Sequence, residues 1–130
     1  MKSLENLQKD FGAFFPTGHM VVAFEHAQDA HQVVHELEEL AHQPLDALEV
    51  SPAEMADFAE KNLHEAGVIA NMGTSLTTVQ AFLDAAKAGA TFLILPVPDK
   101  VAVERVSQAI HHVPFLLAER YHHLVIETVH

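Results

Sequence analysis

Three histidines and a glutamate recur at near-helical spacing in the stretch DAHQVVHELEELAHQ, residues 29–43. On a helical wheel the four lie within roughly 60° of one another, at the border of the apolar face. They are His31, His35, Glu38 and His42. Two imidazoles four residues apart on a helix have the spacing that binds one zinc or nickel ion, and a carboxylate can add an oxygen ligand. The stripe is therefore a candidate site for a divalent metal.

Two other interpretations of the stripe stay open. Imidazole changes charge near a pH of about 6.5, so the histidines could form a proton-sensitive contact. They could also be the polar flank that an acidic helix turns toward water or another subunit. This last interpretation is the simplest, because a histidine pair without a required third ligand is common.

A small-molecule ligand has two further candidate sites. The segment NMGTS precedes a helix, and its N–H groups and hydroxyls could hold a phosphate or carboxylate. The residues concerned are Asn71, Gly73, Thr74 and Ser75. Ordinary helix capping is the simpler explanation, because the spaced glycines and lysine of a P-loop are missing. In RYHHLVIE, alternation puts Tyr121 and His123 on one face of a strand, where they could line a pocket or be ordinary half-buried side chains.

No group of residues in the sequence matches a catalytic motif. Serine, histidine and acidic residues all occur, but no nucleophile elbow or zinc-protease motif connects them. Cysteine is absent, which excludes disulfides, thiolate zinc sites and cysteine nucleophiles. The sequence therefore favours a non-enzymatic regulatory protein. A histidine-based metal-binding protein and a small-molecule enzyme are the alternatives.

The charge balance restricts the partners. The chain of 130 residues has 18 acidic and 7 basic side chains, a net charge of -11 with histidine neutral. Binding to nucleic acid or an anionic membrane needs clustered positive charge, so neither is expected as a partner. No apolar stretch has the length of a signal-peptide core or the ~18 residues of a membrane span, which favours the cytoplasm.

The elements that must position these residues follow from hydrophobic periodicity and turn signals. Alternating or continuous apolar runs predict strands over residues 19–25, 45–50, 90–97 and 124–129. Periodic apolar faces and capping signals predict helices from Asp29 to before Pro44, from Ser51 to about 67, from about 75 to Gly89, and from Asp99 to about 112. The second of these helices opens with the capping box formed by Ser51 and Glu54.

This order predicts one α+β domain. Two βαβ halves that interleave into a four-stranded sheet make the ferredoxin-like arrangement, here with a two-helix insertion over about 51–89, between strands 2 and 3. We assign residues 18–130 to this domain. Residues 1–17 are assigned to an N-terminal helical arm, because Leu4, Leu7 and Phe11 fall at helical intervals.

The first and third predicted strands are apolar on both faces, although a ferredoxin-like sheet normally carries helices on one face only. The inserted helices, a second copy of the chain, or both together must cover the other face, and we favour a homodimer. Segments 19–25 and 91–97 are expected to pair. The buried set is expected to include Val22, Phe24, Val33, Leu37, Phe92, Ile94, Val106 and Ile126.

Two segments of the second half carry a resemblance to a known group. GATFLILPVP, residues 89–98, joins a turn glycine to an apolar strand that ends at proline, and YHHLVIE, residues 121–127, leads a tyrosine into L-x-I-E. This order resembles small bacterial α/β proteins related to the general-stress and heat-induced stress-protein domains. The resemblance implies a ferredoxin-like fold and a stress-associated role, with no catalytic residues to transfer. The chain departs from that pattern in having a helical pair instead of a long glycine-rich middle segment.

Overall fold

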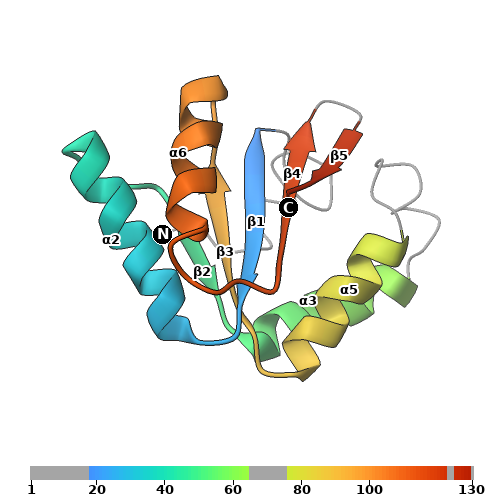
Figure 1. The fold of residues 1–130 in the computed structure, drawn as a ribbon. Coiled ribbons are helices and arrows are strands. Elements are labelled where there is room, and N and C mark those ends of the chain that lie inside the picture. Colours follow the sequence, from blue (N-terminus) through green and yellow to red (C-terminus); the bar gives the residue numbers. More distant parts are fainter. Residues whose placement is uncertain (1–17, 65–75, 123–124, 130) are drawn as a thin grey trace.

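The chain forms an antiparallel β-sheet with helices on both faces (Figure 1). The computed structural model describes residues 18–64, 76–122 and 125–129. The strands within them are β1 (His19–Phe24), β2 (Leu48–Val50), β3 (Thr91–Pro96), β4 (Leu117–His122) and β5 (Val125–Thr128). They form one five-stranded sheet in the order β2-β3-β1-β4-β5, and every neighbouring pair is antiparallel.

The predicted pairing of segments 19–25 and 91–97 is confirmed. In the β1–β3 ladder Val21 lies opposite Ile94 and Val22 lies opposite Leu93. On its other edge β1 pairs with β4, so β1 is the middle strand of the sheet. A strand in this position is covered on both faces, which explains why it is apolar on both.

Helices cover each face of the sheet in pairs. Those described are α2 (Ala27–Ala41), α3 (Pro52–His64), α5 (Leu76–Lys87) and α6 (Lys100–Ile110). Figure 1 shows α2 and α6 together on one side of the sheet and the α3–α5 pair apart from them. On the α2/α6 side, Phe24 and Leu95 of the sheet pack in one cluster with Val33 and Val106 of the helices.

The two-helix insertion predicted between strands 2 and 3 is present as α3 and α5, and it packs on the second face of the sheet. There Phe92 and Ile94 belong to one buried cluster with Met55 of α3 and Phe82 of α5. All four residues are at most 1% exposed. The second face is therefore covered by helices of the same chain. The homodimer was predicted because this apolar face needs a cover, so the prediction no longer has that support.

Short-range signals in the sequence place the helix ends correctly. Ser51 Oγ accepts from the Glu54 N–H at 3.2 Å while Glu54 Oε1 accepts from the Ser51 N–H at 3.3 Å, which is the predicted capping box. Asp99 caps α6 by accepting from the Ala102 N–H at 2.8 Å. Gly89 follows α5 with a φ of +95°, a conformation that glycine adopts without the steric cost of a Cβ.

The number of strands is a correction. The sequence predicts one closing strand over 124–129, whereas the structure has β4 beside β1 and β5 at the outer edge of the sheet. His122 and Val125 are partners in the β4–β5 ladder, so the chain reverses between them. The intervening residues are histidine and leucine, and neither marks a turn as glycine, asparagine or aspartate would.

Of the expected core positions, seven are confirmed as buried: Val22, Phe24, Val33, Leu37, Phe92, Ile94 and Val106. The eighth, Ile126, lies in β5 opposite Tyr121 of β4. The N-terminal arm over residues 1–17, the ligand candidates Asn71, Gly73, Thr74 and Ser75, and the candidate His123 lie outside the described residues.

The end of α2 supplies a stability prediction. His42 terminates the helix in the left-handed region, at φ 55° and ψ 32°, where the backbone of any residue other than glycine is strained by its Cβ. We expect His42→Gly to raise the free energy of unfolding by roughly 0.5–1 kcal/mol in urea denaturation. The matched change Ala41→Gly, in the last helical turn, should lower it by a similar amount, about 0.5–1 kcal/mol. A His42→Gly variant less stable than the wild type would contradict this account.

Candidate functional site

Helix α2 and the edge strand β2 enclose a surface hollow of about 320 Å³, which we call the α2/β2 hollow. Its polar lining is His31, His35 and Glu38 from α2 and Glu49 from β2; its apolar lining is Val34, Leu45, Ala47 and Leu93. Leu48 and Val50 turn to the α3/α5 cluster, so alternation along β2 turns Glu49 to the α2 side. Three of the four residues of the predicted stripe therefore lie at one site.

Each polar residue of this hollow has a defined partner. His31 Nε2 donates to Glu49 Oε1 at 2.5 Å and joins α2 to β2. His35 Nε2 lies 3.0 Å from Glu39 Oε1, one turn along the same helix. Glu38 Oε2 accepts from the Leu45 N–H at 2.9 Å, so this carboxylate holds the turn that leads from α2 to β2.

The fourth member of the stripe is separated from the other three. His42 is the C-terminal cap of α2 and does not line the hollow. Among the described residues, no three histidine, aspartate or glutamate side chains are grouped as they would be around a metal ion. The sequence did not single out Glu49, because nothing local links it to His31, 18 positions earlier.

A larger depression lies between the C-terminal end of α2 and the N-terminal end of α6. This α2/α6 groove has a volume of about 600 Å³, within the range of roughly 300–1,000 Å³ typical of small-molecule pockets. Its apolar walls include Leu37 of α2, Val101 and Val106 of α6, Pro96 at the end of β3, and the connecting residues Leu45 and Pro98.

Three charged residues line the α2/α6 groove: Asp46, Asp99 and Arg105. Asp99 is engaged in capping α6, and Asp46 is exposed in the connection before β2. Within the part of the chain that the structure describes, no carboxylate lies within ion-pair distance of Arg105. In a chain with 18 acidic residues, this guanidinium is a donor available to a ligand.

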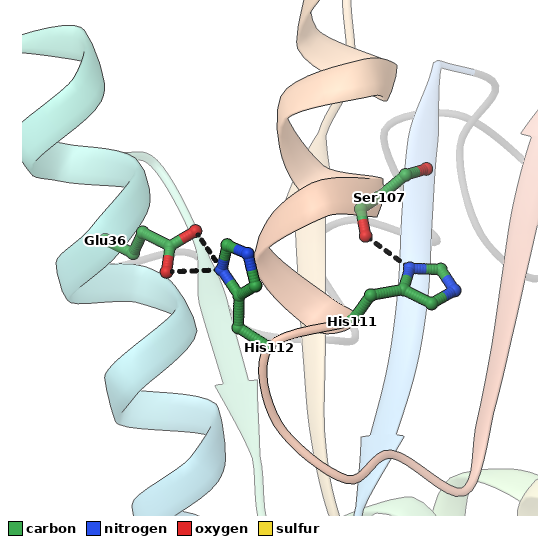
Figure 2. A network of polar contacts seen from close by, with 4 residues as sticks. All are labelled: Glu36, Ser107, His111 and His112. Carbon is green, nitrogen blue, oxygen red and sulfur yellow. Dashed lines mark hydrogen bonds and ion pairs between the residues drawn. The ribbon is translucent and has the colours of Figure 1, made fainter.

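The histidines that follow α6 have structural contacts (Figure 2). His112 Nδ1 lies 2.9 and 3.0 Å from the two carboxylate oxygens of Glu36, and this pair joins the end of α6 to α2. His111 Nδ1 donates to the carbonyl oxygen of Ser107, one turn back in α6. Its ring also meets Phe115 edge to face, with centroids 5.3 Å apart.

The groove is built from residues other than the predicted ligand candidates. Asn71, Gly73, Thr74, Ser75 and His123 lie outside the described residues. Tyr121 lies in β4, which β3 and β1 separate from β2 in the sheet. Arg105 was not singled out from the sequence. The sequence shows only that Arg105 lies next to Val106, which belongs to the apolar face of the helix predicted to begin at Asp99.

Comparison of the chain with protein-family models, with curated proteins and with solved structures found no match. The two sites are therefore interpreted from their own chemistry. None of the helices in the described part of the chain is long and apolar enough to cross a membrane.

Proposed function

We propose that this protein is a non-enzymatic, regulatory module that binds a small anionic amphiphile in the α2/α6 groove. The observation that carries the proposal is the combination of extended apolar walls with one cation that has no carboxylate partner among the described residues, Arg105. Pockets of this kind bind the apolar body of a ligand by burial and orient it through a few polar groups.

The fold supports a binding role at this place. We infer that the sheet is ferredoxin-like and extended by β5, because β2-β3-β1-β4 is the strand order of a split βαβ pair once the α3–α5 insertion is set aside. In this arrangement α2 and α6 are the two crossover helices on one face. A ligand between them would contact both halves of the fold.

The lining of the groove favours an anion. The Asp99 carboxylate already accepts a hydrogen bond from the Ala102 N–H, and the Asp46 side chain is exposed to water. Arg105 is therefore the charged residue of the lining that would select the charge of the ligand. A guanidinium can form two parallel hydrogen bonds with a carboxylate or phosphate. The apolar residues around it would hold a ligand of mixed polar and apolar character.

Among the described residues, the ionisable side chains in the lining of the groove are Asp46, Asp99 and Arg105. We propose binding because Arg105 can recognise an anion, while the Asp99 carboxylate is engaged in capping α6. The stress-associated role suggested by the resemblance, and the homodimer, remain separate predictions. Sedimentation at micromolar concentration would test the homodimer.

A fluorescent probe tests the groove directly. Anilinonaphthalene sulfonate combines an apolar aromatic body with one anionic group, and its emission should rise and saturate when it binds the folded protein. We expect Arg105→Gln to weaken this binding about tenfold, the loss expected for one charge-assisted hydrogen bond of about 1.5 kcal/mol. Val101→Asp, which places a negative charge on the apolar wall, should weaken it at least as much.

The matched control is Lys100→Gln, which removes the same charge from the same helix at an exposed position outside the lining. This variant should bind the probe within about twofold of the wild type, since only long-range attraction is lost. Circular dichroism melting must show that all variants are folded. Equal binding by wild type, Arg105→Gln and Val101→Asp would place the probe elsewhere and overturn the proposal.

A further inference from the structure

The α2/β2 hollow already brings two metal-ligating atoms together. His31 Nε2 and Glu49 Oε1 lie 2.5 Å apart, and their side chains are 63% and 39% exposed. A nitrogen and an oxygen bound to one tetrahedral zinc ion, with bonds of about 2.0–2.1 Å, lie roughly 3.4 Å apart. Two exposed side chains reach that separation by moving apart by about 1 Å, with no change in the backbone.

We propose that His31, His35 and Glu49 bind a divalent transition-metal ion of the zinc class between α2 and β2. Binding puts the metal in place of the hydrogen on His31 Nε2 and leaves a neutral imidazole with its one hydrogen on Nδ1: a neutral ring changes tautomer and releases no proton, whereas an imidazolium gives its Nε2 proton to water. The nitrogen and carboxylate ligands suit zinc or nickel, and water completes the coordination. This proposal is independent of the α2/α6 groove.

The third ligand, His35, is one helical turn from the first. No three histidine, aspartate or glutamate side chains are grouped around one point among the described residues, so His35 has to join His31 and Glu49 by rotation of its side chain. His35 lines the same hollow as His31, and residues at i and i+4 are neighbours on a helix surface. It is paired with Glu39, but both side chains are about 70% exposed, at 74% and 69%. Exposed pairs of this type contribute only ~0.3–0.5 kcal/mol, so the metal can recruit His35 at little cost.

Glu38, which the sequence placed in the stripe, is not expected to be a ligand. Its Oε2 accepts the Leu45 N–H in a partly buried hydrogen bond, and rotation toward a metal would leave that N–H without a partner. His42 lies outside the hollow, at the helix end. The proposed ligands therefore include Glu49, which is not part of the helical stripe, and exclude Glu38 and His42, which are.

Charge favours a cation at this place. The residues that line the hollow include two carboxylates, Glu38 and Glu49, and no lysine or arginine. The chain as a whole carries a net charge of -11. A divalent cation is attracted both by the local carboxylates and by the field of the whole protein.

Calorimetric titration of the full chain with zinc, and separately with nickel, tests the proposal. The wild type should bind zinc or nickel at this site. His31→Ala, His35→Ala and Glu49→Gln should each weaken binding at least about tenfold, because each removes one of three protein ligands. Co²⁺ should give the visible ligand-field absorption of a tetrahedral site in the wild type and lose it in the same three variants.

Three controls separate this site from the alternatives. His42→Ala and His112→Ala should leave binding unchanged, and Glu39→Gln, which releases His35 from its present partner, should not weaken it. If His42→Ala weakens binding and Glu49→Gln does not, the helical stripe alone binds the metal and the proposal is wrong. Absence of zinc and nickel binding by the wild type would also overturn it. Arg105→Gln should not affect metal binding, so failure of the groove proposal is distinguishable.

Discussion

Ile94→Asp is expected to abolish folding. Ile94 is 1% exposed in β3, where it lies opposite Val21 on one side and Leu48 on the other, in the cluster covered by α3 and α5. A carboxylate at this position has no cation beside it, and burial of an unpaired charge costs several kcal/mol even after relaxation. Since a whole domain is stable by only about 5–15 kcal/mol, we expect no cooperative thermal transition in circular dichroism.

Two controls identify the cause of that loss. Ile94→Val removes one methyl group and should cost about 0.5–1.5 kcal/mol, which leaves the protein folded. Val101→Asp introduces the same charge on α6 at a position that is 54% exposed, and it should also fold. A cooperatively melting Ile94→Asp variant with wild-type secondary structure would show that Ile94 is not in the core.

The second large effect is expected at the contact between α5 and the sheet. Phe82 of α5 is fully buried and meets Phe92 of β3 edge to face, with ring centroids 5.9 Å apart and planes at 88°. We expect Phe82→Ala to lower the free energy of unfolding by about 3–5 kcal/mol in urea denaturation, from lost burial and from the cavity left behind. The two-helix insertion would then be part of the stable core.

A double-mutant cycle isolates the ring contact. Phe82→Leu and Phe92→Leu keep apolar side chains at both positions, so the cycle should report a coupling of about 0.5–1.5 kcal/mol for the aromatic pair. A Phe82→Ala variant that loses less than about 1 kcal/mol would indicate a surface helix instead, since changes at exposed positions rarely cost more.

Local patterns predicted the helices and strands around the site well. The Ser51–Glu54 capping box, the Asp99 cap and the turn at Gly89 are each set by hydrogen bonds or dihedral angles within a few residues. The buried positions of the central strands also follow from the sequence, because a strand covered on both faces must be apolar at successive residues. The pairing of segments 19–25 and 91–97 was predicted from the order of the elements, because a split βαβ arrangement makes these strands neighbours, and it is confirmed.

Long-range contacts were not predictable in the same way. The closing segment carried an alternating pattern through the point where the chain reverses, so the pattern did not distinguish one strand from β4 followed by β5. Alternation reports which face a residue takes and not which strand lies beside it. An apolar face likewise does not identify what packs on it, so the sequence left the inserted helices and a second copy of the chain both open as its cover.

The candidate site shows this division most clearly. The helical period alone placed His31, His35 and Glu38 on one flank of α2, and the structure finds all three at the α2/β2 hollow. Only the tertiary structure brought Glu49 to His31 and opened the groove beside Arg105, because each depends on how one element packs over another. A sequence period repeats within one element and carries no information about the distance between two elements, and that distance decides which side chains can bind one ligand.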